Sequence, residues 1–190
     1  GPYYSGGVKP VAVKVPEYDR AAPHGTGAIK AGLNYAMSLY PSVQAHAEGF
    51  ADNMYLDPQT HTFVEESGGA NFLFVDKDGV LVVPQSATDS ILPSITRRSL
   101  VQVAEEMLGM TVVERPVKFE EVASGAFVEC GMCGTAAVIS PVGKVVNGDT
   151  EVAFGSGMEH VGPVMAKLRE TLTGIQDGEI EGPEGWVVKL

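Results

Sequence analysis

Apolar residues recur along the chain at two spacings, one typical of strands and one typical of helices. In residues 8–15, valines alternate with other residues, two of them lysines, which predicts a strand. Residues 31–49 carry apolar side chains three to four positions apart, which predicts a helix that bends or restarts at Pro41. Similar spacing predicts helices over 95–108 and 162–173.

Turn residues divide the other apolar runs into short strands. The segments DPQT (57–60) and DKDG (76–79) each predict the turn of a hairpin. A short helix is expected over 118–123, and a glycine-rich break before residue 136. The expected strands are 53–57, 62–66, 71–75, 80–83, 111–117, 126–130 and 136–139. This order, without a repeat or an internal linker, predicts one mixed α/β domain over residues 1–190.

Composition and charge exclude several classes of protein. The 190 residues are 44% hydrophobic and 19% charged, as in a globular domain, and the net charge is −11. Such an acidic chain is not expected to bind nucleic acid or an anionic membrane. No apolar run approaches the roughly 18 residues of a membrane span, and residues 1–7 lack the pattern of a signal peptide. We expect a cytoplasmic location, and, because the chain does not begin with methionine, we interpret it as part of a longer protein.

The two cysteines, Cys130 and Cys133, form a single C-x-x-C. One such pair cannot complete a four-ligand zinc site, and the four histidines are scattered along the chain, so no metal site is predicted. Two reduced thiols are expected. A redox or binding module that uses the C-x-x-C is the alternative reading.

Lys30 is the first candidate for chemistry, because it is the single cation within GTGAIKAGLNY (25–35). Glycines let the backbone approach a ligand closely. A lysine among small and apolar groups is easily desolvated, which lowers its pKa toward the range in which the amine is a nucleophile. Such an amine can form a Schiff base. A surface lysine at a loop-to-helix junction is the structural alternative.

Three further segments could complete a binding site. Glu65 and Glu66 end a strand at a glycine pair, and a buried carboxylate there would need a cationic partner such as a pyridinium nitrogen. The segment ILPSITRR (91–98), with Ser94 as N-cap, begins a helix, where free N–H groups and Thr96 could bind an anion. The segment GMCGTAAV (131–138) offers small residues and a hydroxyl for a phosphate or carboxylate. Read singly, each segment is explained at least as readily by local structure, as an acidic turn, an ordinary capped helix and a tight turn, respectively.

Together the four segments supply the groups that a pyridoxal-phosphate site requires. Their sequences are also similar to motifs of a known family. GTGAIKAGLNY, EESGGANFLF, ILPSITRRSL, ERPV followed by EE, and CGTAAVISPVG resemble the branched-chain amino-acid aminotransferases, which are class-IV (fold type IV) pyridoxal-phosphate enzymes. The resemblance extends from Tyr18 to the C-terminus. It implies the family's large C-terminal domain, a mixed sheet that forms a partial barrel flanked by helices.

The resemblance also implies an activity. Lys30 would form the internal aldimine with pyridoxal 5'-phosphate and shuttle the α-proton, Tyr35 would hydrogen-bond the phenolic oxygen, and Glu66 would pair with the pyridine nitrogen. The other implied contacts are Leu92 on the ring, Ile95, Thr96 and Thr135 at the phosphate, and the N–H groups of Thr135, Ala136 and Ala137 at the substrate carboxylate. The expected reaction is ping-pong transamination of Leu, Ile or Val with 2-oxoglutarate, as in a branched-chain-amino-acid transaminase.

Two residues and one domain depart from the family pattern. Leu33 and Ser94 replace family glycines, and Ser94 would be strained if its position requires a positive φ. We interpret the chain as lacking the family's small N-terminal domain, and we therefore expect little or no turnover of this chain alone. The full-length protein is expected to be a homodimer. A D-amino-acid aminotransferase, an aminodeoxychorismate lyase and a remnant with an empty site are the alternatives on the same scaffold.

Overall fold

The computed structural model describes residues 8–188. The expectation that residues 1–7 do not form a signal peptide therefore falls outside the described residues. The helices are α1 (Gly32–Ala47), α2 (Ile95–Gln102), its π-helical continuation η1 (Val103–Met107), α3 (Phe119–Ala123) and α4 (Pro163–Gln176). The strands are β1 (Val11–Lys14), β2 (Asp52–Asn53), β3 (Asn71–Asp76), β4 (Leu81–Pro84), β5 (Val112–Arg115), β6 (Phe127–Gly134), β7 (Val138–Asn147) and β8 (Thr150–Ala153).

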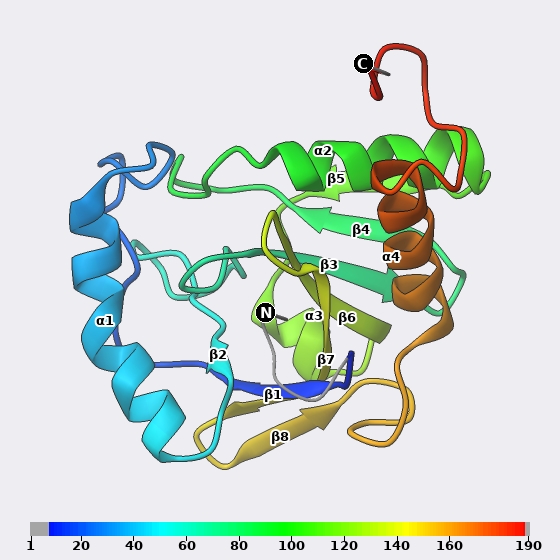
Figure 1. The fold of residues 1–190 in the computed structure, drawn as a ribbon. Helices are drawn as coiled ribbons and strands as arrows, with labels where there is room; N and C mark the ends of the chain where they lie inside the picture. Colours follow the sequence, from blue (N-terminus) through cyan, green and yellow to red (C-terminus); the bar gives the residue numbers. More distant parts are fainter. Residues whose placement is uncertain (1–7, 189–190) are drawn as a thin grey trace.

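The strands form one mixed sheet in the order β2-β1-β7-β6-β3-β4-β5, with β8 paired to β7 (Figure 1). The β1–β2, β1–β7 and β4–β5 pairs are parallel, whereas the β3–β4, β3–β6, β6–β7 and β7–β8 pairs are antiparallel. The predicted hairpin at residues 76–79 is confirmed, because β3 and β4 pair directly across it.

Short bridges connect the two edges of the sheet. Beyond β2, Leu56 pairs with Val64, and the neighbouring Phe63 pairs with Lys118 just beyond β5. The segment 62–66 therefore lies between the two edge strands, as expected for the partial barrel that the resemblance implies. Only isolated bridges form here. The chain does turn back around residues 57–60 as predicted, but the prediction that two regular strands flank this turn was wrong. Asp57 instead accepts hydrogen bonds from three backbone N–H groups of residues 60–63 and shapes an irregular loop.

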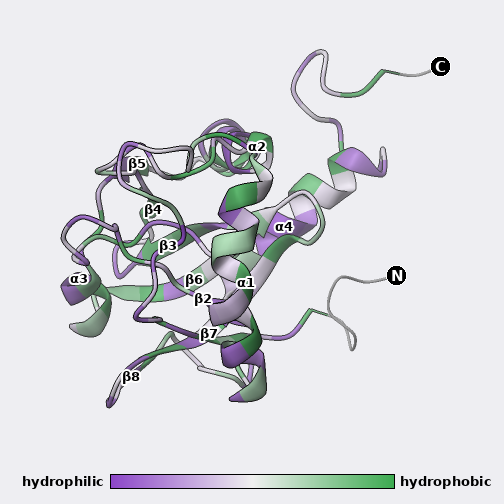
Figure 2. Cartoon of the chain, turned by 90° about the vertical axis from the view of Figure 1, so that its left-hand side faces the viewer, coloured by the Kyte–Doolittle hydropathy of each residue, from purple (hydrophilic) through white to green (hydrophobic). Residues whose placement is uncertain are grey.

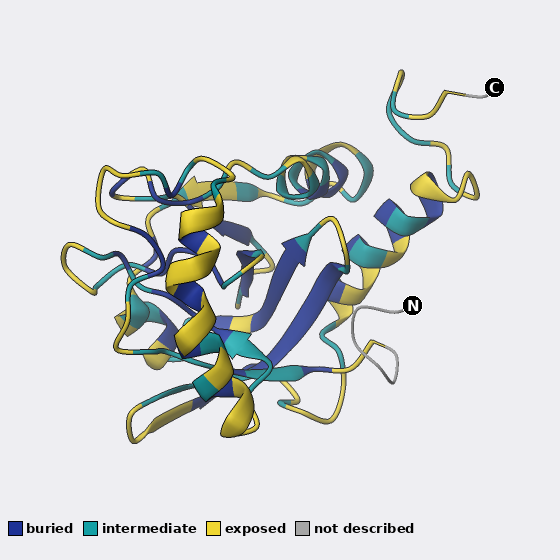
Figure 3. Cartoon of the chain, turned by 60° about the vertical axis from the view of Figure 1, so that its left-hand side comes forward, coloured by how far each residue is buried: buried dark blue, intermediate teal, exposed yellow. Residues whose placement is uncertain are grey.

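The sheet separates two apolar clusters, because side chains alternate along each strand. On β3, Phe72 and Phe74 face a cluster inside the curved sheet, whereas Leu73 and Val75 face a cluster covered by α2, η1 and α4. Figure 3 shows these strands as buried and the outer face of α1 as exposed. The chain thus places α1 at one side of the sheet and α4 at the other (Figure 1).

Most predicted helices are confirmed, and the largest error lies in β6. Helix α1 continues through Pro41, and the 95–108 helix changes to π geometry at Val103. The expected glycine-rich break after residue 130 is instead strand, since β6 runs to Gly134. A Cβ at Gly131 would lie 2.8 Å from the Met165 sulfur, so this glycine permits close packing of α4 and does not end the strand. The strand β8 was not predicted.

Candidate functional site

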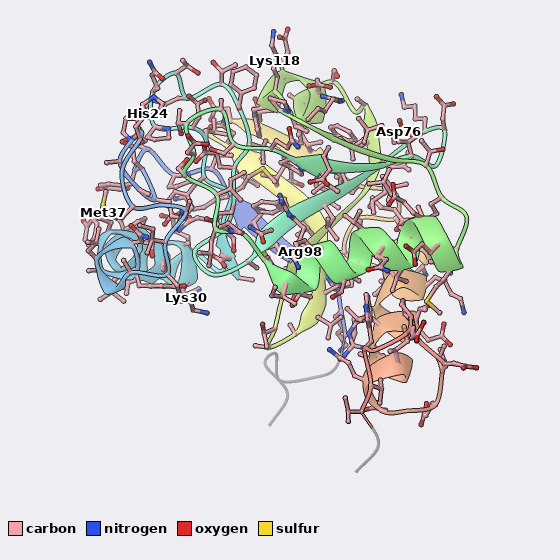
Figure 4. The ribbon with its side chains drawn as sticks, turned by 90° about the horizontal axis from the view of Figure 1, so that it is seen from above. His24, Lys30, Met37, Asp76, Arg98 and Lys118 are labelled. Atoms are coloured by element: carbon pink, nitrogen blue, oxygen red, sulfur yellow. The ribbon has the colours of Figure 1, made fainter. Side chains whose placement is uncertain are left out.

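The Lys30 loop is tied to the first turn of α1 by the buried side chain of Asn34. Its amide nitrogen donates to the carbonyl oxygens of Thr26 (2.8 Å) and Ile29 (2.9 Å), and its amide oxygen accepts from the Thr26 hydroxyl. Lys30 therefore has a fixed backbone position just before the helix. Its side chain is exposed and points outward beside α1 (Figure 4). The expected desolvation of Lys30 is absent from this chain.

Glu66 lines the same cavity as Lys30 and is only 4% exposed. Its Oε1 atom is 2.7 Å from Nη2 of Arg20 and accepts a hydrogen bond from the Leu92 N–H (2.8 Å). Its Oε2 atom accepts from the Asn71 side chain (2.9 Å). Burial raises the pKa of Glu66 to about 7, although Arg20 and the Leu92 N–H both act to lower that pKa.

The neighbouring Glu65 points into a different set of polar groups. It is buried and accepts hydrogen bonds from the hydroxyls of Ser86 (2.9 Å), Thr88 (3.1 Å) and Ser90. Successive side chains of an extended segment point in opposite directions, so the two carboxylates diverge. Glu65 thereby fixes the 86–90 loop, and Glu66 is the one that remains available to a ligand.

The start of α2 forms a third side of the site. Ser94 has an extended backbone with φ −107°, and its hydroxyl accepts from the Arg97 N–H (3.1 Å). The expected strain at Ser94 is therefore absent, and the predicted N-cap is confirmed. The amides of Ile95 and Thr96 stand at the helix start, where N–H groups have no intrahelical partner. Leu33, the other replaced glycine, is also free of a positive φ.

Six of the nine predicted site residues line one cavity of about 270 Å³, close to the lower end of the range for small-molecule sites. These residues are Lys30, Tyr35, Glu66, Leu92, Ile95 and Thr135. Thr96, Ala136 and Ala137 do not line it.

A larger cavity of about 610 Å³ lies between α2, α4 and the C-terminal tail. Arg98 is its one charged lining residue, and no amine or carboxylate lines it.

The two cysteines lie on opposite faces of β6. Cys130 belongs to the cluster inside the sheet, and Cys133 belongs to the cluster under α2 and α4. Both are free and fully buried, and burial raises the pKa of Cys133 to about 12 and that of Cys130 as well. Opposed side chains on one strand cannot form a disulfide, so the redox-module reading of the C-x-x-C was wrong.

Two residues of the site were missed by reasoning from the sequence. Arg20 and Asn71 both line the cavity and both bind Glu66. A signal for Arg20 existed, because a buried carboxylate requires a cationic partner and Arg20 stands directly before an apolar Ala-Ala-Pro. Directly after residues 135–137, the first residue of β7 is the β-branched Val138, whose φ of 60° is a strained backbone conformation.

Two other kinds of feature are absent from the described part of the chain. Within residues 8–188, no helix is long and apolar enough to cross a membrane. Over the same residues, no three His, Cys, Asp or Glu side chains converge in a group that could hold a metal ion.

Comparison with known proteins gives one consistent family. The family model for amino-transferase class IV matches residues 2–145. A branched-chain-amino-acid aminotransferase from Haemophilus influenzae is 49% identical over 100% of this chain and 55% of its own length. One from Helicobacter pylori is 41% identical over 100% of this chain and 54% of its own length. The chain therefore spans about half the length of these curated relatives.

Solved structures agree with this result. A branched-chain amino acid aminotransferase from Escherichia coli superposes with a TM-score of 0.79 at 35% identity, over 93% of this chain and 56% of that one. The branched-chain amino acid aminotransferase from Thermobaculum terrenum, in its PLP-bound holo-form, gives a TM-score of 0.74 at 30% identity, over 90% of this chain and 52% of that one. On the family match and the identity over its whole length, the chain belongs to the amino-transferase class IV family.

Proposed function

We propose that this chain is the cofactor-binding part of a branched-chain-amino-acid transaminase that uses pyridoxal 5'-phosphate. The observation that carries the proposal is that Lys30 and Glu66, from separate segments, line the same cavity. The names of the curated relatives support branched-chain amino acids, that is leucine, isoleucine and valine, as the amino donors. The resemblance implies 2-oxoglutarate as the acceptor.

The residues present fit this cofactor. The cavity is lined by an exposed primary amine and by a buried carboxylate that has a remaining lone pair on Oε2. The free N–H groups at the start of α2 suit an anion. When bound, pyridoxal phosphate would supply an aldehyde for the amine and a ring that accepts electron density.

Each residue would then have a distinct task. Lys30 would hold the cofactor and carry a proton to and from the substrate α-carbon. Glu66 would accept a hydrogen bond from the ring nitrogen, and Tyr35 would donate one to the phenolic oxygen. The phosphate would bind Ile95, Thr96 and Thr135, with Leu92 packed on the ring, and the N–H groups of residues 135–137 would receive the substrate carboxylate.

The proposal extends to a complete enzyme that contains this chain. A small N-terminal domain and a homodimer, both implied by the resemblance, are part of it, as is a cytoplasmic location. The outer face of α1 supports this part of the proposal, because a surface helix normally exposes polar groups. Apolar side chains are exposed on α1 instead, namely Leu33, Met37, Leu39 and Val43, as expected if another domain or subunit covers this face (Figure 2). Cover at this face would also exclude water from Lys30.

Reductive labelling tests the site directly. The 190-residue chain is incubated with pyridoxal phosphate, reduced with borohydride and digested, and the modified lysine is identified by mass spectrometry. We expect the label on Lys30, and we expect Lys30→Arg to lose it. Label spread evenly over the exposed lysines would contradict the proposal.

Substrate preference is tested on the full-length protein. We expect transamination of L-leucine with 2-oxoglutarate, and turnover of the 190-residue chain that is lower by at least about 100-fold, the scale of a misplaced or incomplete site. Activity with D-alanine but not with L-leucine would instead favour a D-amino-acid aminotransferase.

A further inference from the structure

Arg20 is the cation that the fold buries beside Glu66. Its side chain is 6% exposed, and its Nη2 atom lies 2.7 Å from Oε1 of Glu66. The same nitrogen is in contact with the carbonyl oxygens of Gly27 (3.1 Å) and Ser90. Arg20 therefore joins the Lys30 loop, the 86–90 loop and the Glu66 segment at one point.

The surroundings of Glu66 include few other charges. Glu65 lies beside it along the chain, Arg97 approaches from α2, and the Cys133 thiol lies on the neighbouring β6. Lys30 also lines the cavity, and its side chain is exposed. Of the two arginines, Arg20 lowers the pKa of Glu66 more strongly, and it is the one in direct contact.

We propose that Arg20 is a positioning residue, which favours the ionised form of the Glu66 carboxylate and fixes its orientation toward the cavity. The proposal rests on the proposed function, in which that carboxylate accepts a hydrogen bond from the ring nitrogen. A carboxylate accepts such a bond, whereas a protonated carboxyl offers a donor in its place. Arg20 touches neither the substrate nor the cofactor in this role, and it acts through Glu66.

The balance of effects at Glu66 makes this role consequential. Burial raises the pKa of Glu66 to about 7 even with Arg20 in place. Loss of the guanidinium removes the largest influence that lowers that pKa, so Glu66 should hold its proton at neutral pH. Burial of Arg20 by three loops also means that no other cation can move into its position without repacking.

The titration of Glu66 in the cofactor-free chain tests the inference. The 190-residue chain is labelled with carbon-13 at glutamate carboxyl groups, and the Glu66 resonance is assigned by its loss in Glu66→Gln. In Arg20→Met we expect the acid dissociation constant of Glu66 to fall at least about tenfold. Arg115→Met, which removes an arginine paired with Glu121 at the surface, should leave it unchanged. An unchanged Glu66 titration in Arg20→Met would overturn the proposal.

A folding defect in Arg20→Met would itself be informative. Without its partner, Glu66 is tolerated in the core only when it is protonated. Arg20→Met should therefore regain its folded state as the pH is lowered from about 8 to about 6, whereas Arg20→Met/Glu66→Gln should be folded at both values. Equal instability of the single variant at both pH values, or no rescue by the double substitution, would overturn the inference.

The two proposals can fail separately. If borohydride fixes no cofactor on Lys30 in the unaltered chain, the proposed function fails, while the titration still decides the link between Arg20 and Glu66. If the cofactor is fixed on Lys30 and the Glu66 titration is the same with and without Arg20, the positioning role alone is wrong.

Discussion

The two walls of the cavity differ in how completely this chain builds them. At the acid wall, Arg20, Glu66 and Asn71 are all buried and joined by an ion pair and hydrogen bonds. At the amine wall, Lys30 and Ile29 are exposed, and Tyr35 is 40% exposed. The chain therefore fixes the carboxylate by its own folding, whereas it fixes only the backbone of the lysine. Under the proposed function, the group that pairs with the cofactor ring would be held rigidly, and the amine that holds the cofactor would be open to solvent.

The largest expected effect is a difference in stability between the walls. Glu66→Ala leaves Arg20 buried without its partner, which should lower the free energy of unfolding by about 3–5 kcal/mol. Lys30→Ala removes an exposed side chain, and the change should stay within about 0.5 kcal/mol. Urea unfolding of the cofactor-free chain measures both. Comparable losses would mean that the amine wall is also built into the fold.

The amine wall was the easier one to predict from the sequence. Lys30 stands out as a lone cation among small residues, and its approximate position before a helix follows from the apolar spacing of 31–49. Its exposure could not be predicted, because exposure depends on what packs around the loop in three dimensions. The helices and the β3–β4 hairpin followed from periodicity and turn residues for the same local reason.

The acid wall depends on contacts between distant segments, which local patterns do not carry. Arg20 and Glu66 are 46 positions apart, and Arg20 meets Ser90 from 70 positions away. Gly131 illustrates the same limit, because its absence of a side chain serves the approach of Met165 and not a turn. The sequence identified a carboxylate that needs a cation, but the cation present in this chain is an arginine from another loop.

The next effect in size is a pH dependence of stability that comes from the acid wall. The pKa of Glu66 is raised from 4.5 to about 7 in the folded chain. The folded state then retains a proton that the unfolded state has lost, so stability falls as the pH rises between these values. The fall attributable to Glu66 is at most about 3 kcal/mol.

The variant Glu66→Gln isolates this contribution. Its stability relative to the unaltered chain should rise from pH about 5 to about 7 and stay constant above that. Glu121→Gln is the control, because Arg115 lowers the pKa of Glu121 and does not raise it. The stability of Glu121→Gln relative to the unaltered chain should therefore not rise between pH about 5 and about 7. A stability difference for Glu66→Gln that is flat with pH would show that Glu66 titrates as in the unfolded chain.

A smaller effect separates two glycines that line the cavity. At Gly27, beside Arg20, a Cβ would lie 2.4 Å from the Ser90 carbonyl oxygen, so Gly27→Ala must displace backbone and should cost about 1–3 kcal/mol. At Gly69 a Cβ would meet nothing within 4 Å, and Gly69→Ala should be nearly neutral. Thermal unfolding of both variants checks the difference. Equal melting temperatures would mean that the contact between the Arg20 and Ser90 loops is loose.

The smallest perturbation compares the walls by chemical reactivity without changing any residue. Cys133 lines the cavity near Glu66 but is fully buried, whereas Lys30 at the rim is exposed. Brief treatment with an acylating reagent should modify Lys30, while iodoacetamide should leave Cys133 unmodified until urea unfolds the chain. An oxidant should likewise form no disulfide within the chain, because Cys130 faces the opposite side of β6. Rapid alkylation of Cys133 in the folded chain would show that the acid wall is accessible to the reagent. The two walls would then not differ in accessibility.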